Sequence, residues 1–162
     1  MIVSDASPLI SLAKAGKLYL LKEMFGKVLI EEEVKRETID RGKEEGAPDA
    51  SVIEDAVKDG WIEVEKVEVV KSFSGIHKGE GNSILLAKKH KCLVLMDEED
   101  GREVARAVGL KVRGSLYVLK NAVEKGLMSK KDTIRTLDEM IEDGFRISTR
   151  IYVKFLEEME TL

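Results

Sequence analysis

Four acidic residues of the 162-residue chain occupy positions at which a carboxylate could take part in catalysis: Asp5, Glu37, Glu80 and Asp97. If they converge, their charges repel one another, and burying them also costs free energy of desolvation. A hard divalent cation relieves both costs, and sites built from oxygen ligands select Mg²⁺ or Mn²⁺. One or two such ions can activate a water molecule and stabilise a phosphate under attack. The four carboxylates therefore predict a metal site suited to phosphate chemistry.

Two of these acids directly follow predicted strands. Asp5 ends the short apolar segment that begins at Ile2, and Asp97 follows the apolar run Cys92–Met96. A run of this kind is typical of a strand buried on both faces of a parallel sheet, and we expect it to be the central strand. Because ligands of open α/β folds bind at the carboxyl ends of strands, Asp5 and Asp97 are expected at the same edge of the sheet.

The other two acids interrupt the apolar stripes of predicted helices. Glu37 lies three residues after Val34, in a helix expected over 31–41, and Glu80 lies four residues before Ile84 at the start of a later helix. Residues at these spacings share one face of a helix. Both carboxylates are therefore expected to point inward.

Each acid also has a purely structural interpretation, which the sequence leaves open. Asp5 could bond to its own turn, and Asp97 could cap the helix that follows it. Glu37 could end its helix at the surface, and Glu80 could complement the helix dipole. The acids at 31–33 suit the first turn of a helix and predict nothing more. Only the convergence of all four acids at one edge favours the metal site.

Other kinds of site have little support in the sequence. The single cysteine, Cys92, allows neither a disulfide framework nor a thiolate metal site. His77 is expected in a loop and His90 at the surface end of a helix, and neither has a ligand-like partner in the sequence. The segment Gly79–Gly81 lacks the third glycine of a dinucleotide-binding fingerprint, and the sequence has no Walker loop.

Strands that alternate with helices predict an α/β fold, a three-layer α/β/α sandwich with a central, mostly parallel sheet. The length suits one domain, so we expect a single domain over 1–162, with residues 129–162 forming a C-terminal pair of helices. Residues 68–78 are expected to form a mobile loop near the carboxyl edge. The predicted strands are 1–5, 27–30, 61–67 (an edge strand), 92–96 and 110–113.

The composition narrows the class of protein without naming a partner. Charged residues make up 36% of the chain, well above the usual quarter, and the net charge is −4. Charge alone does not indicate nucleic acid binding, although a metal-dependent nuclease can be acidic because the metal neutralises part of its charge. No apolar run approaches the ~20 residues of a membrane span, and the first residues do not resemble a secretory signal. We therefore expect a cytoplasmic protein.

Four segments that contain the candidate acids resemble, in order, the motifs of PIN domains. These segments are Asp5–Ile10, Val34–Glu37, Gly79–Ile84 and Leu95–Asp97. Three further stretches are similar to a mostly prokaryotic, toxin-like branch of that family: Asp97–Arg102, Gly109–Ser115 and Gly144–Ser148. The resemblance covers nearly the whole chain and implies a PIN-like fold.

The resemblance implies a Mg²⁺- or Mn²⁺-dependent ribonuclease that hydrolyses RNA phosphodiester bonds. Asp5, Glu37, Glu80 and Asp97 would then hold the metal and orient the attacking water. Many PIN relatives are the toxins of toxin–antitoxin pairs, are held inactive by a small antitoxin protein, and form dimers. RNA, an antitoxin and a second copy of the chain are therefore the expected partners.

The chain departs from that branch at two positions, and other functions stay open. Glu98 stands where the branch often has a second aspartate, and Tyr117 replaces a glycine, which puts close packing of its helix in doubt. One alternative is a catalytically inactive PIN-like binding module, although the four acids count against it. Another is a phosphatase with an aspartyl nucleophile, but Ser7 occupies the position where that chemistry usually has a second aspartate.

The final helix suggests how copies of the chain would associate. Ile151, Phe155 and Met159 form one apolar stripe, and Tyr152 and Leu156 widen it. The stripe alone is compatible with packing on its own domain. Together with the resemblance, however, it predicts a homodimer whose interface includes the C-terminal half and leaves the acidic site open.

Overall fold

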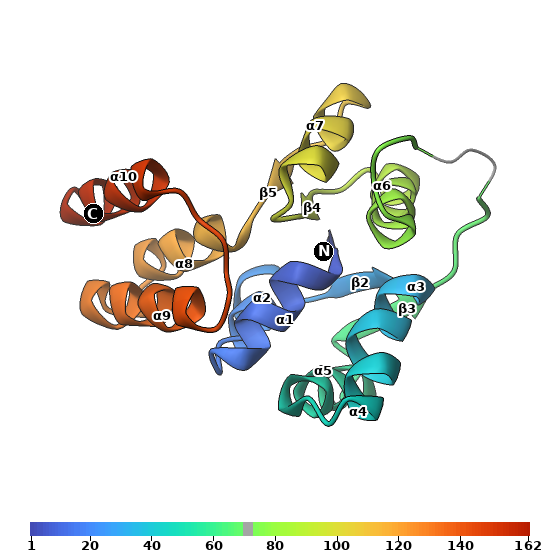
Figure 1. Cartoon of the computed structure of the whole chain (residues 1–162), viewed down its shortest axis with the longest axis horizontal. Coiled ribbons are helices and arrows are strands. Elements are labelled where there is room, and N and C mark those ends of the chain that lie inside the picture. The colour runs from blue at the N-terminus through green and yellow to red at the C-terminus, as the bar shows by residue number, and fades with distance from the viewer. Residues whose placement is uncertain (70–72) are drawn as a thin grey trace.

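The computed structural model describes residues 1–69 and 73–162 and has a parallel five-stranded sheet at its centre, in the order β3-β2-β1-β4-β5 (Figure 1). The strands are β1 (Ile2–Ser4), β2 (Val28–Glu31), β3 (Ile62–Glu65), β4 (Val94–Leu95) and β5 (Val112–Arg113). Every pairing is parallel. The predicted α/β fold is confirmed, and β3 is an edge strand as expected.

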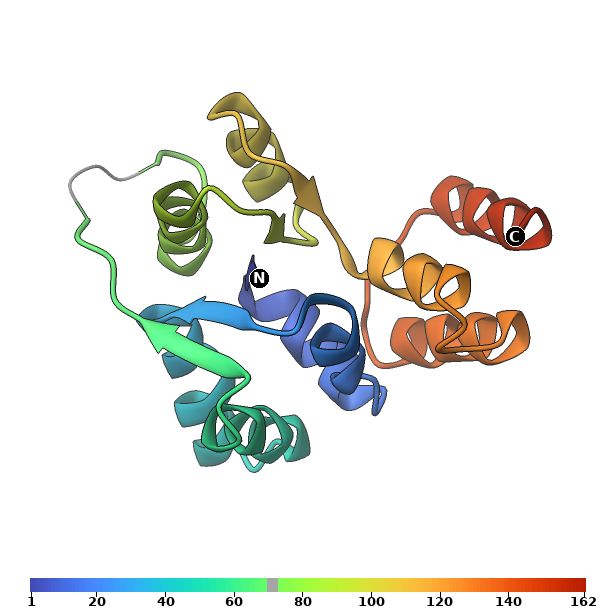
Figure 2. The same ribbon diagram turned by 180° about the vertical axis from the view of Figure 1, so that it is seen from behind.

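Helices cover both faces of this sheet, as Figures 1 and 2 show from opposite sides. They are α1 (Ala6–Lys14), α2 (Tyr19–Phe25), α3 (Glu32–Lys35), the π-helix η1 (Arg36–Asp40), α4 (Arg41–Glu44), α5 (Pro48–Lys58), α6 (Lys78–His90), α7 (Glu99–Ala107), α8 (Ser115–Glu124), α9 (Lys130–Glu142) and α10 (Thr149–Glu160). Among the described residues, no helix is long and apolar enough to cross a membrane.

Two apolar cores separate the three layers, because neighbouring strand residues point to opposite faces. In β1, Ile2 joins the core under α1, α2 and α5, whereas Val3 joins the core under α6 and α7. In β4, Leu95 and Val94 divide in the same way. This alternation explains why short, continuous apolar runs form the strands.

The strand order creates a switch point beside β1, which is the central strand. The chain continues from β1 to β2 and β3 on one side and later returns to place β4 and β5 on the other. In doubly wound sheets, ligands bind in the crevice at the carboxyl ends of the two strands where the order reverses. Asp5 follows β1 and Asp97 follows β4, so both acids lie at this crevice.

Strand β4 is shorter than predicted and is not central. Only Val94 and Leu95 form it, rather than 92–96, and it lies between β1 and β5. The flanking residues still bond to the neighbouring strands, since the Val3 N–H donates to the Leu93 carbonyl and the Met96 N–H to the Arg113 carbonyl. Val94, Leu95 and Met96 are buried as predicted, whereas Cys92 and Leu93 are only half-buried, and only Val94 and Leu95 keep regular strand geometry.

The helix predicted over 31–41 is longer and is interrupted by a wide turn. It runs through α3, η1 and α4 to Glu44, and Glu37 lies in the π-helical segment. Gly42 lies in α4, and an added Cβ there would lie 2.8 Å from the Ala50 side chain. The close contact between α4 and α5 thus requires glycine at this position.

Serine side chains cap the last two helices of the chain. Ser129 Oγ accepts from the Asp132 N–H and begins α9, and Ser148 Oγ accepts from the Ile151 N–H and begins α10. Tyr117 is half-buried in α8, and the Arg113 guanidinium lies 5.4 Å from the centre of its ring. The loop expected over 68–78 includes residues 70–72, which lie outside the described residues.

Candidate functional site

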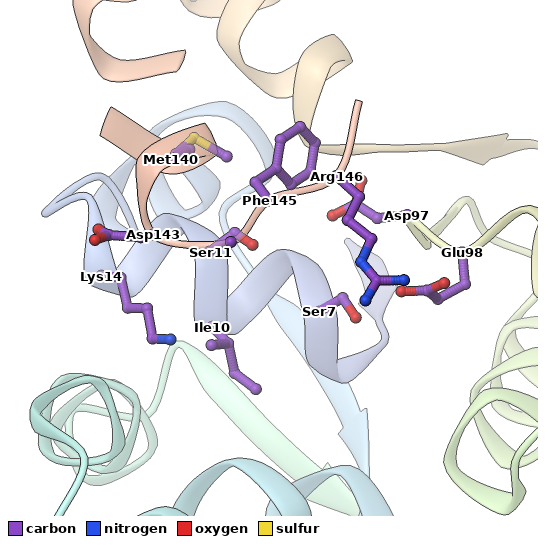
Figure 3. Close-up of a pocket in the computed structure, with 11 residues that line it drawn as sticks. Ser7, Ile10, Ser11, Lys14, Asp97, Glu98, Met140, Asp143, Phe145 and Arg146 are labelled. Carbon is purple, nitrogen blue, oxygen red and sulfur yellow. The ribbon is translucent and has the colours of Figure 1, made fainter. Parts of the chain in front are cut away.

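Three of the four candidate acids line one pocket at the carboxyl edge of the sheet. Asp5, Glu37 and Glu80 contribute to this acidic pocket, together with Glu33, Glu98 and Asp100. Asp97 lines a second pocket instead, which we call the adjoining pocket. Ser7, Glu98 and Arg146 line both pockets, so the two adjoin each other. Figure 3 shows the residues of the adjoining pocket.

Asp5 is the most deeply placed acid of the acidic pocket. It follows β1 directly, is the N-cap residue of α1, and is 4% exposed. Its only side-chain donor among the described residues is Ser83 Oγ, at the long distance of 3.4 Å. Burial raises the pKa of Asp5 to about 7; the backbone of Ala6 opposes this rise, and the charges of Glu80 and Glu37 add to it. At neutral pH this buried carboxylate lacks a compensating positive charge.

Glu80 approaches Asp5 from the first turn of α6. It is buried, and its Oε2 accepts the His77 N–H at 3.0 Å. Glu80 thus also has a structural role at the start of its helix, through this hydrogen bond. On its other side α7 comes close, because a Cβ on Gly101 would lie 3.4 Å from the Glu80 carboxyl carbon. The backbone of α7 therefore holds the carboxylate in place.

Glu37 reaches the pocket from the π-helical segment η1. It is half-buried, and a Cβ on Gly79 would lie only 2.6 Å from its Oε1, so glycine is required where α6 passes this carboxylate. Burial and the charge of Glu33 raise the pKa of Glu37, while Arg41 and His77 oppose the rise. π-Helical turns are frequent at functional sites, and this one carries a candidate ligand.

Asp97 is held by the start of α8. Its Oδ1 accepts the Ser115 N–H and its Oδ2 accepts from Ser115 Oγ, both at 2.7 Å. A Cβ on Gly114 would lie 2.7 Å from Oδ1, so this approach also depends on glycine. Burial raises the pKa of Asp97, and the two bonds from Ser115 oppose the rise.

These bonds differ from the helix cap that the sequence left open for Asp97. Asp97 does not cap the next helix, because the N-cap residue of α7 is Glu98. Ser115 is the first residue of α8 rather than its cap, and Ser7 lies inside α1, whose N-cap is Asp5. Because α8 begins with Gly114 as its N-cap residue, the Ser115 side chain bonds to Asp97 rather than to its own helix.

The donor chemistry of the site suits a hard divalent cation. Within residues 1–69 and 73–162, no group of three or more His, Cys, Asp or Glu side chains stands close enough to hold an ion as placed. The acidic pocket nevertheless offers only carboxylate oxygens as strong ligands beside its one histidine, His77. Oxygen ligands of this kind bind Mg²⁺ or Mn²⁺ rather than softer metals. Burial is the main cause of the raised pKa of Asp5, the charges of Glu80 and Glu37 add to it, and a bound cation would relieve both costs.

Glu31, a buried acid outside the four candidates, has a structural function that the sequence did not reveal. It ends β2, and its carboxylate accepts the Glu33 N–H at 2.7 Å, Asn82 Nδ2 at 3.1 Å and the Val67 N–H at 3.3 Å. These bonds join β2 to α3, to α6 and to the segment after β3. The first-turn position predicted only a dipole effect, and the polar Asn82 inside α6 was the available signal for more.

Sequence patterns also missed Arg146, which lies in the loop between α9 and α10. It lines both pockets although it is 49 positions beyond Asp97 in the sequence. Loop residues follow no periodicity, so the only available signal was the stretch Gly144–Ser148, which resembles part of a known family.

Comparisons with known proteins agree with this architecture. Residues 1–161 match the DUF3368 family model, which is described as a PIN domain. A solved PilT N-terminus domain protein from the hyperthermophilic archaeon Sulfolobus solfataricus P2 is similar, with a TM-score of 0.53 and 16% identity over 76% of this chain and 93% of that one. At this identity the likeness shows the fold alone. No curated protein matches the chain.

Proposed function

Because the chain belongs to the PIN-domain family, whose members are generally nucleases, we propose that it is a Mg²⁺- or Mn²⁺-dependent endoribonuclease that hydrolyses RNA phosphodiester bonds. The observation that carries the proposal is the acidic pocket at the switch point of the sheet. There, Asp5 is buried beside Glu37 and Glu80 without a positive partner among the described residues, and its pKa is raised to about 7. Divalent cations satisfy sites of this kind.

Asp5, Glu37, Glu80 and Asp97 would hold the cation. When bound, such an ion acts as a Lewis acid that favours ionisation of water and offsets the charge of a phosphate. The chain's own contribution is preorganisation, because tight supporting contacts fix catalytic groups before the substrate arrives. Ser115 holds both oxygens of Asp97, and the His77 N–H holds Glu80.

The alternative is a catalytically inactive PIN-like binding module. The spacing of the carboxylates favours it, since no described group of acids is close enough to hold an ion as it stands. Titration of the protein with Mn²⁺ in a calorimeter, together with cleavage of a fluorescent RNA in Mn²⁺ and in EDTA, distinguishes the two functions. We expect Mn²⁺ binding and cleavage that EDTA abolishes, and we expect Glu37→Gln to weaken both.

Glu37 suits this test because it is only half-buried, so its replacement should leave the fold intact. If the folded wild-type protein binds neither Mn²⁺ nor Mg²⁺, the inactive module is established. Metal binding without cleavage of RNA would leave the metal site but refute the ribonuclease.

We further propose that the protein acts in the cytoplasm as the toxin of a toxin–antitoxin pair, as a homodimer whose acidic pocket a small antitoxin can cover. The support is the exposed apolar surface of α10, where Ile151 is 48% and Val153 46% exposed. Light scattering at tens of micromolar should give a dimer that Ile151→Glu dissociates. Phe155 is a poor probe, because it is buried in the chain's own core.

A monomeric wild-type protein would contradict the dimer. A dimer that Ile151→Glu leaves intact would place the interface elsewhere. Copurification of a small protein encoded next to this chain, with loss of RNA cleavage in the complex, would support the antitoxin.

A further inference from the structure

We propose that Arg146, in the loop between α9 and α10, binds a phosphate of the nucleic acid substrate where the two pockets meet. The inference rests on the proposed ribonuclease function and deepens it. It gives the C-terminal helices a role in substrate binding in addition to packing.

The position of Arg146 is the first observation. Arg146 lines both pockets. The other basic residues each line one of them: Arg41 and Lys78 the acidic pocket, and Lys14 the adjoining pocket. In Figure 3 the Arg146 side chain extends from the loop toward Glu98, on the side of Ser7. A guanidinium at this junction lines the same pocket as Asp5, Glu37 and Glu80.

The second observation is that the charge of Arg146 is not used elsewhere. Lys78 pairs with Glu33 at 3.7 Å, and Arg102 donates to the Met96 carbonyl at 3.0 Å. Arg146 forms neither an ion pair nor a hydrogen bond with any described residue, and it is exposed. Its five N–H groups therefore remain available to a ligand.

The loop that carries Arg146 is anchored on both sides. The Phe145 N–H donates to the Met140 carbonyl at 2.9 Å, and the side chains of Phe145 and Ile147 pack against the larger core. Gly144 adopts a φ of 105°, a conformation that favours glycine, and turns the chain out of α9. With an apolar anchor on either side, Arg146 projects outward from a fixed base.

The chemistry of the pocket explains why a cation is needed here. Six acids line the acidic pocket against Arg41, Lys78 and Arg146, so a polyanion is repelled unless positive charge meets it. A bound metal would neutralise the deep end of the pocket, and Arg146 would meet a phosphate at its mouth. Arginine suits this task because its planar guanidinium can donate two parallel hydrogen bonds to phosphate oxygens.

The test compares Arg146→Gln with Arg150→Gln, using full-length protein and a short single-stranded RNA labelled with a fluorophore. Arg150 is a matched control, because it is exposed in the first turn of α10 and lines neither pocket. RNA affinity is measured by anisotropy with Ca²⁺ at several salt concentrations, cleavage is measured with Mn²⁺, and Mn²⁺ affinity is measured without RNA.

We expect Arg146→Gln to weaken RNA affinity and raise KM by about tenfold or more, since a hydrogen bond to a charged group has about this effect on an equilibrium. In a plot of the logarithm of RNA affinity against the logarithm of salt concentration, the slope of Arg146→Gln should be shallower by about 0.7, the value for one phosphate contact on a single strand. Mn²⁺ affinity should not weaken. Arg146→Lys should recover part of the RNA affinity, and Arg150→Gln should resemble the wild type.

Equal RNA affinity and KM for Arg146→Gln and Arg150→Gln would overturn the proposal. If Arg146→Gln instead loses its fold or its Mn²⁺ binding, Arg146→Lys decides, and full RNA affinity in that variant would also overturn the proposal. A wild-type protein that binds RNA without cleaving it would refute the ribonuclease but still allow the comparison of affinities. A wild-type protein that does not bind RNA would refute the role of Arg146.

Discussion

Two neighbouring strands of the sheet, β1 and β2, each end in a buried carboxylate, and the two acids have opposite surroundings. Glu31, 2% exposed, receives hydrogen bonds from three nitrogen donors on three different segments. Asp5, 4% exposed, receives one long side-chain bond, from Ser83, and faces Glu37 and Glu80. Burial alone therefore does not distinguish a structural acid from a functional one.

The difference lies in how each negative charge is compensated. A buried carboxylate is stable when N–H donors replace the water it has lost. Glu31 meets this condition within the chain, so its replacement should damage the fold. Asp5 does not meet it, so its replacement should spare the fold and weaken binding of the cation that would supply the missing positive charge. The same-size pair Asp5→Asn and Glu31→Gln tests this comparison directly.

The largest expected effect is on RNA cleavage. Asp5→Asn removes the deepest charge of the acidic pocket, and we expect its cleavage rate in Mn²⁺ to fall by at least about a hundredfold, as loss of groups around a metal commonly costs. Glu31→Gln, assayed at a temperature where it remains folded, should keep most of its activity. Equal losses in the two variants would remove the distinction between the acids.

The second effect is on the free energy of unfolding, which Glu31→Gln should lower more than Asp5→Asn does. Glu31→Gln places an amide group opposite three donors, which leaves at least one of them unsatisfied, so we expect a loss of about 2–3 kcal/mol in urea denaturation without metal. Asp5→Asn should lose less than about 1 kcal/mol or gain stability, because it removes repulsion. A larger loss for Asp5→Asn than for Glu31→Gln would contradict the comparison.

The sequence predicts those parts of the site that have a local pattern, and it misses those that depend on distant segments of the chain. Asp5 and Asp97 could be predicted because they follow apolar runs, and parallel strands bring their carboxyl ends to one edge. Glu37 was predicted to point inward, but the π-helical turn that carries it arises within the folded chain and leaves no periodic signal. The donors of Glu31 come from three distant segments, and no local pattern announces them.

A third expected effect concerns pH and has a defined direction. Between the ordinary pKa of 3.8 and about 7, folded protein keeps a proton on Asp5 that the unfolded chain has released. Stability without metal should therefore fall as pH rises through this window, by an amount on the order of 4 kcal/mol, and change little from this cause outside it. Chemical denaturation at pH 4, 5.5 and 7 in EDTA measures the slope.

Asp5→Asn serves as the control for this pH dependence, since the variant has no proton to lose and its slope should be smaller. Mn²⁺ should also reduce the fall in wild-type stability, because metal binding favours the ionised carboxylate. A wild-type slope that Asp5→Asn leaves unchanged would show that another group causes it.

The smallest effect compares the serines that serve the two acids at the switch point. Ser115 Oγ donates to Asp97 at 2.7 Å, whereas Ser83 Oγ lies 3.4 Å from Asp5 and donates to the Gly79 carbonyl at 2.8 Å. Ser115→Ala should therefore lower stability by about 1 kcal/mol and weaken Mn²⁺ binding several-fold, because Asp97 loses one of the two bonds that orient it. Ser83→Ala should leave Mn²⁺ affinity nearly unchanged, since Asp5 is positioned by the end of β1. Calorimetric titration of both variants measures the difference, and a greater loss of affinity in Ser83→Ala would show that Asp5 depends on that long hydrogen bond after all.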